Sequence, residues 1–333
     1  MAAREQPLNV PPLLAATRDY VARALAPGGH GELAILDDSA RAWLALGAAQ
    51  VAPGMLVVVA ENTMALELLW QDVQTLGGGL PMVKLPALNV EASKLITGQP
   101  SPDVSGERMN TLRQCLAWQG RGLLVTCVQA LLEPVATPEQ LQQDTLHLRE
   151  QQECDLEQLC GKLVAAGYAF ESEVLAKGQA SRRGGLLDVW PLTEDWPVRL
   201  EFFGDVLEGL RSFDPAEQRS RDKLREVWLP PARDAAADGP AAAPTDYVPA
   251  DASFLWLDNE AITHHYAMSA ELAGSGETAL AAERDYANWQ LMLARRCAGG
   301  GQLTAGGADL AHDSGAHPVA GLAALTAQAV PPD

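Results

Sequence analysis

Apolar runs alternate with amphipathic stretches over the first 130 residues. The runs at 31–36, 55–60, 80–85 and 122–127 have the length and aliphatic composition of buried β-strands. Between them, apolar residues recur every three to four positions. This spacing predicts helices after Pro11-Pro12, after Ser39, after Asn62 or Thr63, and over 105–118. Buried strands alternating with helices predict a parallel sheet covered on both faces, which is an α/β fold.

The pattern changes after about residue 145. A helix predicted at 155–166 is followed by a segment, 184–213, in which apolar and polar residues alternate, as GGLLDVW, VRLEFF and VLEGLRSF. The connections are PLTEDWP and Gly204-Asp205, and the second is a hairpin signal. We therefore expect a β-meander within a small α+β module that is inserted in, or appended to, the α/β domain.

The remaining chain returns to the first pattern. Residues 229–249 contain few large apolar side chains, which predicts a linker or surface loop. A strand is predicted at 254–258 and helices at 259–272 and 283–296. The tail from residue 298 is rich in glycine and alanine, and within it only 319–327 has a helical pattern.

Charge and cysteine usage narrow the class of protein. The formal net charge of −19 argues against a chain that grips nucleic acid by itself. Twelve of the 24 lysines and arginines lie between Arg149 and Arg233, so a surface for an acidic partner is expected there. Five cysteines without a CxxC motif predict a reducing, cytoplasmic setting and no metal site. Since the longest aliphatic run is Met55–Ala60, no membrane segment is expected.

No catalytic motif stands out in the sequence. The turn after the first predicted strand, 37–41, reads DDSAR, without the glycines and lysine that a phosphate loop needs. The Gly161-Lys162 pair lies inside a predicted helix, and the chain has no GxSxG motif. His264-His265 is an adjacent pair in a helix, for which a surface position is the simplest interpretation. We therefore expect no enzyme activity, no cofactor, and no catalytic, cofactor-binding or metal-binding residues.

The VRLEFF segment carries the most informative pattern. Its period of two predicts a core face formed by Val198, Leu200 and Phe202. The opposite face then holds Arg199, Glu201 and Phe203. An arginine beside an aromatic ring is typical of an interface anchor, although Phe203 packed under a local loop would give the same pattern.

Two further arginines enter the neighbouring predicted strand. Arg182 and Arg183 are expected to join the patch around Phe203 and Arg199, and Glu201 to pair with one of them. The candidate partner-binding residues are therefore Arg182, Arg183, Arg199, Glu201 and Phe203.

The same segment resembles a known family. GQASRRGGLLDVWP, PVRLEFFGD, LRSFDPAEQRS and LPPARD, between Gly178 and Asp234, are similar to a run shared by UvrB and the bacterial transcription-repair coupling factor, Mfd. UvrB itself has an intact phosphate loop and a tyrosine-rich hairpin, whereas residues 85–102 here contain no tyrosine. The chain therefore resembles the N-terminal, UvrB-like region of Mfd.

The resemblance implies an architecture with defined boundaries. It implies an α/β fold, a degenerate P-loop-NTPase-like parallel sheet with an inserted small α+β (β-meander) domain. Residues 1–148 would form the first part of the α/β domain, 149–213 the inserted UvrA-binding-like domain, and 214–310 the return to the α/β domain, including a linker at 231–249. Residues 311–333 would be a flexible tail or the start of a truncated further domain.

The resemblance also implies a function. In this family the insert binds UvrA, so that a non-catalytic adaptor recruits nucleotide excision repair to stalled transcription. It also packs against a C-terminal domain in the resting protein. Positions implicated in UvrA contact are similar to Arg183, Arg199 and Phe203 here. The domains that bind RNA polymerase and translocate DNA have no counterpart in these 333 residues, so we expect a fragment or a stand-alone relative.

Two alternatives stay open at this stage. The first is a UvrB-like ATPase or DNA-damage binder, which would have to bind nucleotide despite Asp37-Asp38. The second is a purely structural or autoinhibitory module, in which Phe203 would be buried.

Overall fold

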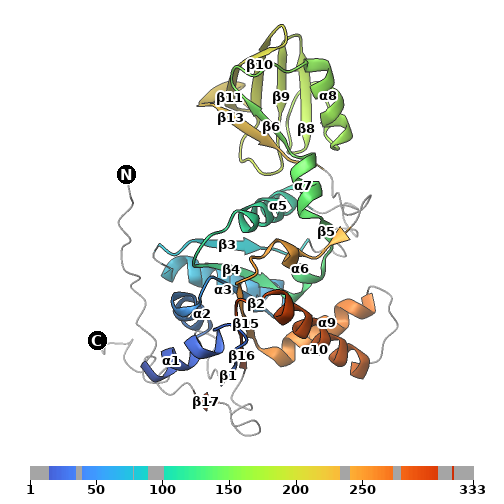
Figure 1. Ribbon diagram of the computed structural model, residues 1–333. Coiled ribbons are helices and arrows are strands. Elements are labelled where there is room, and N and C mark those ends of the chain that lie inside the picture. The colour runs from blue at the N-terminus through green and yellow to red at the C-terminus, as the bar shows by residue number, and fades with distance from the viewer. Residues whose placement is uncertain are drawn as a thin grey trace, which may run out of the picture. The chain divides into compact units, whose positions relative to one another are not determined.

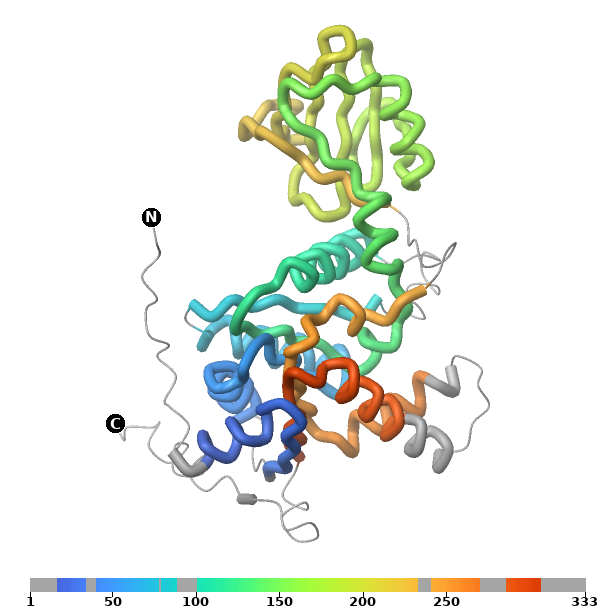
Figure 2. Tube along the Cα trace, in the orientation of Figure 1, coloured from blue at the N-terminus to red at the C-terminus, as the bar shows by residue number. Residues whose placement is uncertain are grey.

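The computed structural model describes residues 15–34, 40–77, 79–88, 101–232, 241–272, 279–306 and 317–318. The chain divides into two compact units. The first comprises residues 1–87, 111–132 and 247–333, and the second 88–110 and 133–246. Figure 2 shows this path: the blue start and the red end of the tube belong to the first unit, and its yellow-green stretch lies in the second.

The first unit is built on a parallel sheet (Figure 1). The strand order is β17-β1-β16-β15-β2-β4-β3, and every neighbouring pair is parallel. The central strands β2, β4 and β15 are buried along their whole lengths, since helices cover the sheet. The strands are β1 (His30–Ala34), β2 (Met55–Ala60), β3 (Met82–Leu85), β4 (Gly122–Cys127), β15 (Ser253–Leu257), β16 (Gln302–Gly306) and β17 (His317–Pro318).

Helices of this unit pack in two groups, α1–α2–α3 and α6–α9–α10. Asn62 caps α3, where its side chain accepts a hydrogen bond from the Ala65 N–H. The helix α5 (Pro102–Leu116) passes from the second unit into the first. The other bounds are α1 (Ala15–Ala24), α2 (Ala40–Val51), α3 (Thr63–Leu76), α6 (Val128–Leu132), α9 (Asn259–Leu272) and α10 (Ala279–Arg296).

The α/β prediction is confirmed, but the sequence did not indicate two strands of the sheet, β16 and the short β17. Residues 302–306 form β16, between β1 and β15, within the stretch interpreted as a Gly/Ala-rich tail. The tail interpretation was wrong there because QLTAG has small residues and a single large apolar side chain, Leu303. The helix predicted at 319–327 and most of the turn at 37–41 lie outside the described residues.

The second unit contains a six-stranded sheet in the order β12-β11-β10-β9-β8-β7. All its neighbours are antiparallel except β7 and β8. The meander predicted at 184–213 is β9–β11, and Gly204, with φ of +61°, opens the hairpin turn between β10 and β11. The strands are β7 (Ala169–Phe170), β8 (Gln179–Arg183), β9 (Leu186–Val189), β10 (Val198–Phe203), β11 (Val206–Asp214) and β12 (Arg219–Leu224).

Short elements accompany this sheet. The strands β6 (Leu146–Arg149) and β13 (Glu226–Leu229) pair with each other, and β5 (Val135–Ala136) pairs with β14 (Ala241–Ala242). The same part of the chain forms two helices, α7 (Pro138–Asp144) and α8 (Leu156–Ala165). A 3-10 helix, η2 (Pro244–Tyr247), follows β14. Within the predicted linker, Thr245 and Tyr247 are buried, so the end of that stretch is packed rather than free.

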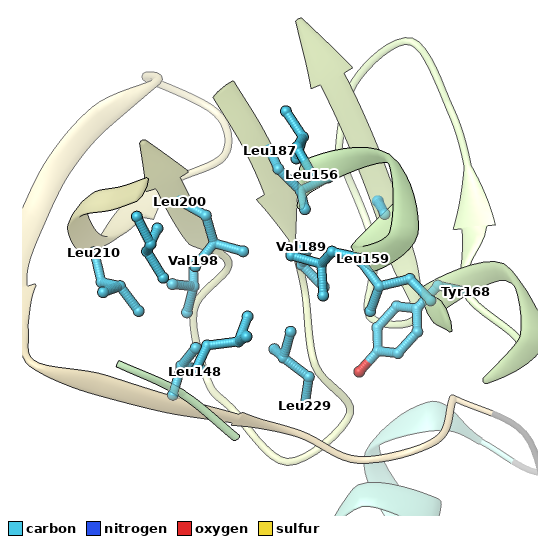
Figure 3. Close-up of a cluster of buried hydrophobic side chains, with 14 residues drawn as sticks. Leu148, Leu156, Leu159, Tyr168, Leu187, Val189, Val198, Leu200, Leu210 and Leu229 are labelled. Carbon is cyan, nitrogen blue, oxygen red and sulfur yellow. The ribbon is translucent and has the colours of Figure 1, made fainter. Parts of the chain in front are cut away.

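One hydrophobic core holds the second unit together (Figure 3). Asp155 caps α8 by accepting from the Gln158 N–H, and the helix presents Leu156, Leu159 and Leu163 on one face. These leucines pack on one face of the six-stranded sheet, against side chains that include Leu187, Val189, Val198 and Leu200. Full burial of each such side chain contributes roughly 1.5–3 kcal/mol.

Candidate partner-binding site

The sheet face opposite this core carries the candidate site. Alternation along the strands places Arg183, Leu186, Asp188, Arg199, Glu201, Phe203, Arg211 and Phe213 on this outer face. Strand register pairs them across the sheet: Arg183 lies opposite Leu186, Leu186 opposite Glu201, and Asp188 opposite Arg199. The predicted face of VRLEFF is therefore the observed one.

Neighbouring side chains on the outer face hold the largely buried Arg199 side chain in place. Its Nε and Nη2 atoms bond the Asp188 carboxylate at 2.7 and 2.8 Å, and Nη2 also donates to Gln218 Oε1 at 2.9 Å. The guanidinium lies over the buried Phe213 ring, 4.5 Å from its centroid. The hydrogen bonds to Asp188 raise the pKa of Arg199 above its ordinary value. Arg199 thus keeps its charge and has one orientation.

Glu201 and Arg183 each have a charged partner. Glu201 pairs with Arg211 of β11, and not with Arg182 or Arg183, so that detail of the prediction was wrong. The diagonal neighbour on the adjacent strand is nearer than a residue two strands away. Arg183 bonds Glu173 Oε1 at 3.0 Å and the Ser172 carbonyl at 2.9 Å. Its guanidinium therefore lies at the edge of the face.

Phe203 is the most exposed aromatic residue of the site. Its side chain ends β10 next to the Gly204-Asp205 turn and is 75% exposed. On the same face, Leu186 is 38% exposed, and the half-buried Val206 lies opposite Phe203. This end of the face offers apolar surface beside Glu201 and Arg183.

Arg182 lies apart from the other candidates. Strand alternation directs it to the core face of β8, where it bonds Glu157 of α8 at 2.6 Å. The hydrogen bond to Glu157 raises the pKa of Arg182 above its ordinary value. The structure therefore brings Arg183, Arg199, Glu201 and Phe203 onto one face and places Arg182 on the other.

Sequence reasoning missed four residues of the outer face, Leu186, Asp188, Arg211 and Phe213, and also Gln218, which bonds Arg199 from a turn. Asp188 follows an apolar run in GGLLDV, and its carboxylate within a strand was the available signal, since a buried charge needs a partner. Gln218 is in a turn, with φ of +55°, and sequence spacing does not show that it reaches Arg199.

The carboxyl edge of the parallel sheet is where a nucleotide would be expected. There, Arg41 at the start of α2 lies 3.0 Å from Glu61, and 3.6 Å from Asp258. Two carboxylates beside one arginine leave little positive potential for a phosphate. In the described part of the chain, no group of three or more His, Cys, Asp or Glu residues is placed to hold a metal ion.

Part of the second unit is similar to a known family. Residues 146–234 match the family described as the UvrB interaction domain, which covers the sheet and its outer face. The matched stretch lies within the second unit, so this part of the chain is similar to the UvrB interaction domain.

The chain also aligns over longer stretches with transcription-repair-coupling factors. One from Staphylococcus aureus is 31% identical over 179 residues, and one from Myxococcus xanthus is 36% identical over 183 residues. Each alignment covers 54% of this chain and 15% of the relative's length. The chain is homologous, over about half its length, to the N-terminal region of transcription-repair-coupling factors, which connects it with DNA repair. None of the helices in the described ranges has the apolar length that a membrane span requires.

Proposed function

We propose that this chain is a non-catalytic adaptor that binds UvrA through the outer face of its UvrB interaction domain. Within a coupling factor, this contact recruits nucleotide excision repair to stalled transcription, while other regions engage RNA polymerase and DNA. The observation that carries the proposal is the exposed Phe203, set among charged groups on a single face.

The composition of the face supports a protein partner. Exposed aromatic residues and arginines supply most of the binding energy at protein interfaces, and a polar rim commonly surrounds them. Here Phe203 and Leu186 supply the apolar centre, while Arg183 and the Glu201–Arg211 pair supply the rim. The family match and the coupling-factor relatives support UvrA as that partner.

Titration of UvrA with this chain and with its Phe203→Ala variant tests the proposal. We expect Phe203→Ala to weaken binding by on the order of 2 kcal/mol, about 30-fold, because a hot-spot ring is lost. Binding should also weaken as salt is raised, since the rim is charged. The unfolding free energy should barely change because the ring is exposed.

Leu68→Ala provides the matched control. Leu68 is an exposed apolar residue on α3 of the other unit, so its truncation should leave UvrA affinity unchanged. Wild-type affinity in a folded Phe203→Ala variant would contradict the proposed docking surface. No binding by the wild-type chain would contradict the proposed partner.

A further inference from the structure

Arg199 uses one edge and one face of its guanidinium inside the protein. Its Nε donates to Asp188 Oδ1, and its Nη2 donates to both Asp188 Oδ2 and Gln218 Oε1. These three bonds account for every N–H on Nε and Nη2. The Phe213 ring covers one face of the same group.

The remaining two N–H groups are on Nη1. Among the described residues, Nη1 of Arg199 has no hydrogen-bond partner. It is also absent from the buried side-chain atoms of the described residues that have no hydrogen-bond partner, so it is not itself buried. Nη1 therefore reaches the surface, although only 14% of the Arg199 side chain is exposed.

We propose that Asp188 and Gln218 are positioning residues of the docking surface: they hold Arg199 so that its Nη1 edge meets an oxygen acceptor of the partner. This inference rests on the proposed binding of UvrA. The acceptor is an oxygen atom with a free lone pair, such as a carboxylate or carbonyl oxygen, since Nη1 only donates.

The physical reason is the cost of ordering a long side chain. A free arginine loses on the order of 0.5–1.5 kcal/mol of rotamer entropy when a partner immobilises it. Here Asp188 and Gln218 have already immobilised Arg199, so the partner gains the hydrogen bond without that loss. A lysine has no planar fork, and it cannot bond Asp188 twice and still present a second edge.

The location fits a single interface with Phe203. Arg199 and Phe203 are four residues apart on one face of β10, which corresponds to roughly 13 Å along a strand. Between them, the Glu201 carboxylate is already paired with Arg211, so it does not claim Nη1. The polar contact and the apolar contact therefore lie within the width of one ordinary interface.

A double-mutant cycle on UvrA affinity tests the positioning role. Asp188→Asn removes the carboxylate charge and one acceptor oxygen, while Gln218→Ala removes the third bond from an exposed turn residue. We expect Asp188→Asn to weaken binding about tenfold and Gln218→Ala about threefold, since Arg199 regains freedom. In an Arg199→Ala background, both changes should alter affinity by less than about twofold.

Controls separate positioning from stability. Glu217→Ala alters the same turn without touching Arg199, and it should bind like the wild type. Arg199→Lys keeps the charge and should bind as weakly as Arg199→Ala. Chemical unfolding of each variant shows which are folded, and if Asp188→Asn is not, Gln218→Ala alone decides the result.

The outcomes are distinguishable. Losses from Gln218→Ala or Asp188→Asn that add fully to the Arg199→Ala loss would overturn the positioning role. So would wild-type affinity in those variants, or in Arg199→Ala, and UvrA binding through Phe203 would stand in each case. No binding by the wild-type chain would overturn the proposed function itself.

Discussion

Arg182 and Arg183 are neighbours in the chain, and they bind acidic partners on opposite faces of one sheet. Arg182 bonds Glu157 of α8 on the core face, whereas Arg183 bonds Glu173 on the outer face that carries Phe203. Two adjacent, chemically identical side chains therefore belong to different surfaces.

Because the two arginines lie on different faces, their alanine variants should differ in UvrA affinity. We expect Arg183→Ala to weaken UvrA binding severalfold, by about 1 kcal/mol, as for a rim cation. Arg182→Ala should leave the affinity unchanged, because its guanidinium does not share the face of Phe203. Isothermal titration of both variants measures this difference, and equal losses would mean that the interface extends around the edge of β8.

Two helical glycines should respond oppositely to alanine. A Cβ added to Gly106 in α5 would lie 1.9 Å from the Leu192 carbonyl oxygen, whereas one added to Gly161 in α8 meets no atom within 4 Å. We expect Gly106→Ala to destabilise the fold by roughly 1–3 kcal/mol and Gly161→Ala to stabilise it by roughly 0.5–1 kcal/mol. Urea unfolding of the variants measures both effects, and a neutral Gly106→Ala would contradict the close packing of α5.

The hydrogen bond between His147 and Glu226 should stabilise the fold less at acidic pH than at neutral pH. Nε2 of His147 lies 2.9 Å from Glu226 Oε2, and this hydrogen bond, with Arg149 nearby, lowers the pKa of Glu226 below its ordinary value of 4.5. A carboxyl group whose folded pKa is lowered stabilises above its unfolded pKa, and this stabilisation is lost as pH falls through the folded value.

Unfolding measured from neutral to acidic pH tests this linkage. Glu226→Gln should make the acid loss of stability shallower below about pH 4.5. A variant at the exposed Glu208, for which no such hydrogen bond is found among the described residues, serves as the control. If the unfolding free energies of Glu226→Gln and the wild type fell equally as pH was lowered, the assigned role of the His147–Glu226 pair would be contradicted.

We expect no nucleotide binding. Arg41 is paired with Glu61 and Asp258 at the carboxyl edge of the sheet, so these groups offer a phosphate little positive potential. A thermal shift assay with ATP and Mg²⁺ should show no change, whereas a ligand at 100 times its Kd adds about 2.7 kcal/mol of stability. A dose-dependent rise in melting temperature would instead favour a UvrB-like ATPase.

Continuous apolar runs made parts of the fold predictable. The strands 55–60 and 122–127 were predicted to the residue, since each is buried on both faces and reads as aliphatic throughout. β16 was missed because the packing of its neighbours, rather than its own composition, makes QLTAG a central strand. Tertiary context overrides weak local preference in such segments.

The candidate site was predictable only in part. A period of two placed Arg199, Glu201 and Phe203 on one face, and the structure agrees. The bonds from Arg199 to Asp188 and Gln218 depend on strand register and on a turn with positive φ, which a single strand pattern does not reveal. The exposure of Phe203 likewise depends on which segments cover its face.

The pairing of β6 with β13 brings together the start and nearly the end of the segment that matches the UvrB interaction domain. Leu146 lies opposite Leu229, and Leu148 and Val227 contribute to the same core as α8. A segment that starts and finishes at one point can be grafted into a loop of an unrelated host without forcing the host's chain apart. Because residues 146 and 229 are neighbours, we expect that this segment can be transferred into a surface loop of another protein as a single piece.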